Sequence, residues 1–175
     1  MAEATAFNLG SGIKAERKLL VTCVDSSNVG STEPIWTIVG RGVEDSAIEF
    51  NPDTSTTTDI LGITDTTVNK LETEQDLDPC TVRGGDTLAV KLYNQVKYQR
   101  LSELSNYKVL IIYAFVGASG SYEAEMHTGC TITPQSIGGD ATVDMPININ
   151  FSNNKTHGTV NDYKGTITFT PATTG

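Results

Sequence analysis

Alternating apolar and polar positions run along most of the chain and predict β-strands. The clearest case is segment 143–151, where five apolar residues alternate without a break. Segments 17–25 and 108–116 are apolar on both faces, which is typical of strands in the middle of a sheet. Further strands are predicted at 122–133 and 163–170. The sequence therefore predicts a mainly β protein.

One segment follows the helical period instead. Leu88, Leu92 and Val96 recur at four-residue spacing, and we expect them to form the core face of a helix over 86–101. Asp86 is a suitable N-cap, because its carboxylate can accept the free N–H groups of the first turn. The pattern indicates an antiparallel β-sandwich or open barrel with one flanking helix.

The predicted domain comprises residues 1–175 and carries an N-terminal arm, residues 1–17, and a long β-ribbon, residues 36–72. The ribbon is expected to turn at 51–53 and then to continue through a run rich in threonine, which favours extended backbone. Its apolar residues do not fall on one face, so either Gly62 marks a bulge or both faces see a mixed environment. Such a ribbon is hard to stabilise alone, and we expect it to pair with other copies of the chain.

The charge balance is acidic, with 21 Asp and Glu against 12 Lys and Arg. This excess argues against a surface that binds nucleic acid, although it is compatible with a surface that nucleic acid passes. The simpler interpretation is that the charge keeps the protein soluble. No apolar run reaches the roughly 18–20 residues of a membrane span, and the N-terminus lacks a secretory pattern. We expect a protein made in a cytoplasm or released by lysis.

Catalytic and metal-binding patterns are weak. His127 and Cys130 form an HxxC pair, but three residues along a strand place them on opposite faces. Glu123 and Glu125 share a strand face and could form a catalytic dyad, but solvated surface carboxylates are the favoured interpretation, as for His157 in a predicted loop. Small apolar core residues are the interpretation for the three widely spaced cysteines, Cys23, Cys80 and Cys130. We expect no enzyme, no metal and no cofactor.

Three segments carry a resemblance to a known family. They are WTIVGRGVEDSAIEFNPDTSTTTDILGIT (Trp36–Thr64), NKLETEQDLDPCTVRGGDTLAVKL (Asn69–Leu92) and YEAEMHTGCTITPQSIGGDATVDMPININFS (Tyr122–Ser152). Together they resemble the major tail tube proteins of long-tailed bacteriophages, especially those of low-GC Gram-positive hosts and their prophages. The resemblance extends over about residues 7–170.

The resemblance implies a structural subunit whose hexameric rings stack into a tube that conducts the viral genome during ejection. The ribbon would line the bore and close a lumenal barrel through neighbouring subunits. It implies a negative lumen that DNA passes without specific binding, with candidate lining residues Glu49, Asp59, Asp65 and Glu72. Candidate inter-subunit residues are Trp36, Gly40, Gly42, Pro52 and Gly62.

The implied partners are a tape measure protein, a tail terminator and distal tail or baseplate proteins, without membrane insertion. The protein would reside in the virion tail after assembly in the host bacterial cytoplasm. The N-terminal arm, the loop 26–34 and the C-terminus would make stacking or surface contacts.

Other functions remain open at this point. The nearest is an inner-tube subunit of a contractile phage tail or tailocin-like particle, which would conduct protein or ions. A β-sandwich binding module predicts a signal peptide and an aromatic-lined site, whereas the chain has a single tryptophan, Trp36. An enzyme is the third alternative, with no supporting constellation of residues.

Overall fold

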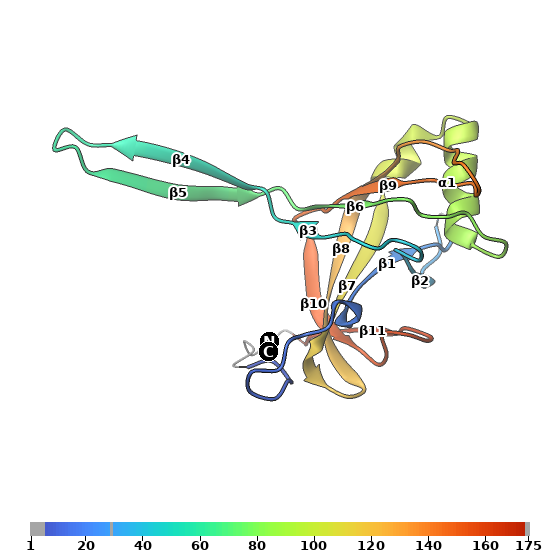
Figure 1. Cartoon of the computed structure of the whole chain (residues 1–175), viewed down its shortest axis with the longest axis horizontal. Coiled ribbons are helices and arrows are strands. Elements are labelled where there is room, and N and C mark those ends of the chain that lie inside the picture. The colour runs from blue at the N-terminus through green and yellow to red at the C-terminus, as the bar shows by residue number, and fades with distance from the viewer. Residues whose placement is uncertain (1–5, 29, 174–175) are drawn as a thin grey trace.

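The computed structural model describes residues 6–28 and 30–173. Within them the chain forms a nine-stranded antiparallel sheet, a separate two-stranded ribbon and one α-helix, α1 (Figure 1). The N-terminal arm and the C-terminal tail fall partly, and the loop 26–34 at one residue, outside the described residues. The elements are β1 (Leu20–Asp25), β2 (Trp36–Ile38), β3 (Ile48–Glu49), β4 (Pro52–Thr58), β5 (Thr64–Leu71), β6 (Glu74–Leu77), α1 (Thr87–Lys97), β7 (Tyr107–Ala118), β8 (Ser121–Pro134), β9 (Ile147–Asn150), β10 (Lys155–Val160) and β11 (Phe169–Pro171).

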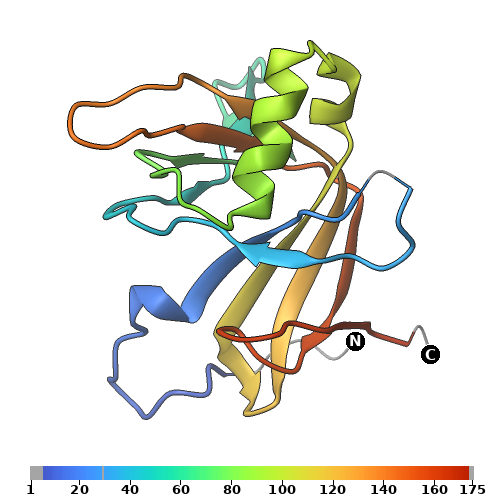
Figure 2. The same cartoon turned by 90° about the vertical axis from the view of Figure 1, so that its right-hand side faces the viewer.

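The large sheet is organised around β8. This strand pairs with β7 on one side, and on the other side first with β10 and then with β9. The pairing with β7 shifts by one residue opposite Gly129, whose φ of 79° suits glycine. Such a bulge bends a strand, and β8 thereby belongs to two strand layers that curl around a common interior (Figures 1 and 2). The prediction of a mainly β, antiparallel fold with one helix is confirmed.

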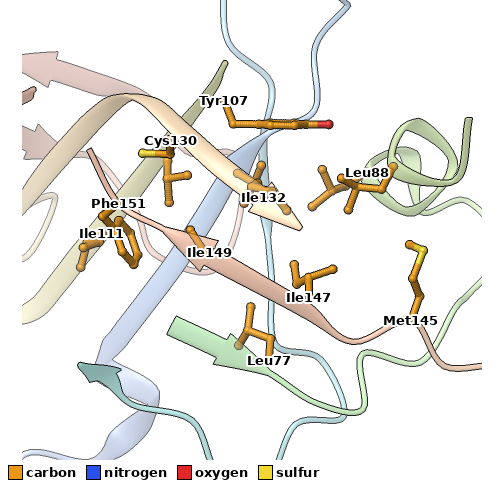
Figure 3. Packing of buried hydrophobic residues seen from close by; sticks show 13 residues of the cluster. Leu77, Leu88, Tyr107, Ile111, Cys130, Ile132, Met145, Ile147, Ile149 and Phe151 are labelled. Atoms are coloured by element: carbon orange, nitrogen blue, oxygen red, sulfur yellow. The ribbon is translucent and has the colours of Figure 1, made fainter. Parts of the chain in front are cut away.

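The buried side chains form two clusters on opposite faces of β7 and β8. The first lies between the curled sheet and α1 (Figure 3) and contains Leu88 and Leu92 of the helix together with Ile132, Ile147 and Ile149. The second lies on the other face of the sheet, and its buried members are Cys23, Leu110, Ile112, Ala124, Val160 and Ile167. The first cluster fixes α1 against one end of the sheet.

The helix begins where the sequence predicts but ends earlier. Asp86 is its N-cap, and its carboxylate accepts the N–H of Ala89 at 3.0 Å. Leu88 and Leu92 are buried as predicted, whereas Val96 is 48% exposed and Gln95 is buried in its place. Placing Val96 in the core was wrong. Each four-residue step along a helix of 3.6 residues per turn moves the side chain roughly 40° around the axis, so two steps from Leu88 carry Val96 off the buried face.

Three predicted segments differ from the structure. Segment 143–151 is a strand only over Ile147–Asn150, directly after Pro146, which has no N–H for a sheet. Segment 163–170 forms a strand only at its end, because the carboxylate of Asp162 accepts the N–H groups of the next three residues and holds a turn there. The first strand begins at Leu20, after a 3₁₀ turn at Arg17–Leu19.

Candidate assembly surface

The β4–β5 ribbon projects away from the rest of the molecule as a sheet of its own (Figure 1). Every residue of both strands is exposed. The predicted ribbon 36–72 was too long, because β2 pairs with β1 and β3 pairs with β6 in the large sheet. The predicted turn at 51–53 was also wrong. Pro52 and Asp53 already belong to β4, and only Asn51, with a φ of 41°, lies outside the strand.

The pairing register gives the ribbon two different faces, because alternate partners point to the same side. One face has no ionisable group and consists of Pro52, Thr54, Thr56, Thr58, Thr64, Thr66, Val68 and Leu71. The opposite face carries charge and consists of Asp53, Ser55, Thr57, Asp65, Thr67 and Lys70. We call them the uncharged face and the charged face.

Threonine hydroxyls on the uncharged face satisfy one another. Thr56 pairs with Thr66 at 3.2 Å, and Thr58 pairs with Thr64 at 3.1 Å. Cross-strand threonine pairs of this kind stabilise a hairpin modestly. Because the hydroxyls are already hydrogen-bonded to each other, another surface could cover this face at a small desolvation cost.

A bulge at Gly62 was one of two alternatives for the ribbon, and the bulge lies elsewhere. The register shifts between Asp53 and Thr54, where Asn69 is the extra residue of β5. Gly62 instead belongs to the turn at the tip, with a φ of 78°. With the register known, Val68 and Leu71 lie together on the uncharged face.

The tip of the ribbon is a hydrogen-bonded turn. One carboxylate oxygen of Asp59 accepts the N–H groups of Leu61 at 2.8 Å and of Ile63 at 2.9 Å. The backbone N–H of Asp59 donates to the carbonyl of Ile63 at 2.9 Å. Gly62 supplies the positive φ that the turn requires. Asp59 therefore organises this turn, a role that the sequence analysis did not assign to it.

A second polar surface lies on the outer face of the sheet formed by β3, β6, β9 and the end of β8. Pairing places three carboxylates there, Glu49, Glu74 and Asp76, beside the amides of Asn148 and Asn150. Glu49 and Glu74 are direct cross-strand partners, and like charges so placed are destabilising. No lysine or arginine belongs to the paired residues of this face. We call it the acidic sheet face.

Two members of the acidic sheet face were missed in the sequence. Glu74 and Asp76 fall in segment 72–85, where the turn signals Asp78-Pro79 and Gly84-Gly85 favour a connection between elements. In the structure Gln75 is buried and hydrogen-bonds Thr22 at 2.8 Å and Ser46 at 3.1 Å. Apolar–polar alternation does not reveal this strand in the sequence, because the buried residue between the two carboxylates, Gln75, is itself polar.

The structure does not bring the four predicted lumenal carboxylates together. Glu49 lies on the acidic sheet face, Asp65 on the charged face of the ribbon and Asp59 at its tip. Glu72 lies at the base of the ribbon and forms an ion pair of 2.5 Å with Lys70. Their exposure to a lumen stays a prediction.

The predicted inter-subunit residues also occupy separate places. Trp36 is half-buried and packs against the second cluster. Gly40 and Gly42 follow β2 with φ of 92° and 85°, so each adopts a conformation that other residues resist. Pro52 and Gly62 lie at the two ends of β4 and its turn. Contacts of these residues with other subunits stay a prediction.

The interpretation of Glu125 as a solvated residue was wrong, because β10 covers this part of β8 and leaves its side chain 16% exposed. His157 is exposed as expected, although it lies in β10 rather than in a loop. Glu125 accepts a hydrogen bond from the hydroxyl of Tyr113 at 3.3 Å and contacts Lys155 at 3.4 Å and His157 at 3.3 Å. Nε2 of His127 lies 3.6 Å from it, while Nδ1 is 2.7 Å from the carbonyl oxygen of Ser152. These neighbours, His127 first, lower the pKa of Glu125 to about 2. The cluster is a network of polar side chains within the sheet, in which Lys155 is the cationic partner of Glu125.

Cysteine placement agrees with the expectation for two of the three residues. Cys23 and Cys130 are buried, and Cys80 is half-buried. Among the described residues, no group of three or more His, Cys, Asp or Glu has an arrangement suited to a metal ion. No helix within residues 6–28 and 30–173 has the length and apolar character that a membrane crossing requires.

No protein-family model matches the chain, and no curated protein does. Among the solved structures that resemble it are two for which 86% of this chain and 95% of the other align. One is a chain from an extracellular contractile injection system, the PVC sheath–tube complex in the extended state, with a TM-score of 0.49 and 12% identity. The other is from the anti-feeding prophage cap, the AFP tube-terminating cap, with a TM-score of 0.48 and 11% identity.

Proposed function

We propose that this chain is a structural subunit of a phage-tail-like tube, in which hexameric rings stack around a channel. The observation that carries the proposal is the β4–β5 ribbon, a two-stranded sheet with every residue exposed. An isolated two-stranded hairpin is marginally stable in water, and its free edges invite pairing with other chains. A ribbon that pairs with neighbouring subunits resolves both problems.

The channel wall in this proposal includes the acidic sheet face. A surface with Glu49, Glu74 and Asp76 repels phosphate groups, so DNA passes without adhering to it. The direct opposition of Glu49 and Glu74 costs stability in the isolated subunit. That cost is consistent with a face whose negative charge serves the assembled tube.

The proposal includes the partners and location that the sequence resemblance implies. The tube is that of a non-contractile phage tail, assembled in the host cytoplasm together with tape measure, terminator and distal tail proteins, and it conducts the genome at ejection. An inner tube of a contractile particle has the same need for stacked rings. The two differ in one partner, because only a contractile tube binds a sheath protein. Co-sedimentation of assembled tubes with a candidate sheath protein separates them.

Negative-stain electron microscopy of the concentrated protein tests the central claim. We expect rings or tubes with a central channel. The matched control replaces residues 52–71 by two glycines, which is feasible because the N–H of Glu72 donates to the carbonyl of Asn51 at 3.2 Å across the base of the ribbon. We expect this variant to melt like the wild type and to form no tubes. Wild-type protein that stays monomeric in the presence of its tail-initiating partners would contradict the proposal.

A further inference from the structure

The tip of the ribbon exposes large apolar side chains. Ile60 is 102%, Leu61 77% and Ile63 57% exposed, and they follow one another around a single turn. The turn is held by the carboxylate of Asp59 and by Gly62, so its shape is set before any contact forms. A preorganised apolar projection loses little conformational entropy when it binds, which is the property of a good anchor.

A groove at the other end of the molecule has matching properties. Its volume is about 420 Å³, within the range of ligand-binding pockets. It lies between α1, β2 and the segments that flank them, and its apolar lining includes Trp36, Leu88, Leu92, Met145 and Ile147. Two aliphatic side chains from a turn can pack against this apolar lining.

Charge at the two surfaces is complementary. The groove is lined by Arg41 and Arg83, both exposed, and no carboxylate of the described residues forms an ion pair with either. Its one acidic lining residue, Asp86, accepts the N–H of Ala89 at the helix N-terminus. The tip carries Asp59 and, two residues beyond Ile63, Asp65. Opposite charges around an apolar contact favour one orientation of docking.

The tip and the groove lie at opposite ends of the long axis (Figure 1), so one chain cannot join its own two surfaces. We propose that the tip Ile60–Leu61–Ile63 of one subunit inserts into this groove of a second copy of the chain. The contact is head-to-tail, which is the geometry that propagates an assembly rather than closing a dimer. The inference rests on the proposed tube function and gives Asp59 and Asp65 a docking role instead of a lumenal one.

The native Cys80 lines the groove and allows a direct test. Leu61→Cys is combined with Cys80→Ser, and the tip thiol is converted to a mixed disulfide with an aromatic thiol. This protein is mixed with unlabelled wild type, so that only Cys80 of a second copy can attack the tip sulfur and release the aromatic thiolate. Because burial raises the pKa of Cys80 to about 11, the reaction is run at pH 8.5. Thr57→Cys with Cys80→Ser, labelled in the same way, is the control on the charged face.

We expect a disulfide-linked dimer of the Leu61→Cys chain with wild type, formed at least tenfold faster than with the Thr57→Cys chain, and Cys80 identified by mass spectrometry. Tubes that form without this selective cross-link would overturn the inference and leave the tube function standing. Absence of both tubes and cross-link would refute both. A selective cross-link without tubes would support head-to-tail docking and count against the tube function.

Discussion

The network of polar side chains around Glu125 makes a quantitative prediction about stability and pH. The carboxylate is 16% exposed and lies within 3.6 Å of polar atoms from His127, Lys155 and His157. The imidazole of His127 is the main cause of a pKa lowered from 4.5 to about 2, followed by Lys155 and His157. Tyr113 shares the site, and burial is the main reason that its own pKa is raised. We take Glu125→Gln as the perturbation.

The direction of the pKa shift determines how the stability contributed by Glu125 changes with pH. The folded state holds Glu125 ionised more strongly than the unfolded state, so its contribution is complete above the unfolded pKa of 4.5 and is lost as the pH falls toward 2. At 1.36 kcal/mol per pKa unit, the ionised carboxylate contributes about 3 kcal/mol at pH 5 and about 1.4 kcal/mol at pH 3. The stability difference between wild type and Glu125→Gln is therefore expected to shrink by about 2 kcal/mol between these two pH values.

Urea denaturation followed by circular dichroism at pH 5, 4 and 3 measures this difference, because the other titrating carboxylates are common to both proteins. Glu123→Gln is the matched control, since Glu123 lies on the same face of β8 and has no ion pair among the described residues. We expect the difference from wild type to change more steeply with pH for Glu125→Gln than for this control. A Glu125→Gln difference that is constant from pH 5 to pH 3 would refute the argument.

Three further predictions concern folding, the ribbon and the acidic sheet face. Leu92→Ala removes a side chain that is 1% exposed and should cost about 2–5 kcal/mol, whereas Val96→Ala should change the free energy of unfolding by less than about 1 kcal/mol; equal losses in urea titrations would contradict the helix orientation. Gly62→Val places a β-branched residue at a φ of 78° and should reduce tube formation in electron micrographs without changing the melting temperature of the body; normal tubes would show that the turn shape is unimportant. Glu49→Lys with Asp76→Lys should leave tubes intact but make them co-sediment with DNA at low salt, and tubes that still exclude DNA would count against a lumenal position.

The sequence predicts the elements whose signal is local. Asp86 is an N-cap because it precedes an apolar helical period, and β7 is central because both of its faces are apolar. It also predicts that part of 36–72 is a ribbon in need of partners, since threonine-rich strands without an apolar face are visible in the sequence alone. These features depend on residues a few positions apart.

The features that the sequence did not predict depend on distant partners. Gln75 looks like a loop residue until its hydrogen bonds to Thr22 and Ser46 are known, and this hides the strand that carries Glu74. Glu125 looks like a solvated surface residue until β10 is placed beside it. In both cases a tertiary contact buries a polar residue that the sequence alone indicates to be exposed.

The residues of the buried clusters and the residues of the β4–β5 ribbon lie in different parts of the chain. Among the described residues, no member of either buried cluster lies between positions 49 and 73. The subunit can therefore fold without its ribbon, while the ribbon's uncharged face and apolar tip remain without contacts in the single chain. In the proposed tube, pairing between subunits would cover those surfaces only above some protein concentration, because a bound state gains stability in proportion to the logarithm of partner concentration. Under that proposal the chain would stay folded and dispersed while dilute, and it would assemble where an initiating partner raises its local concentration.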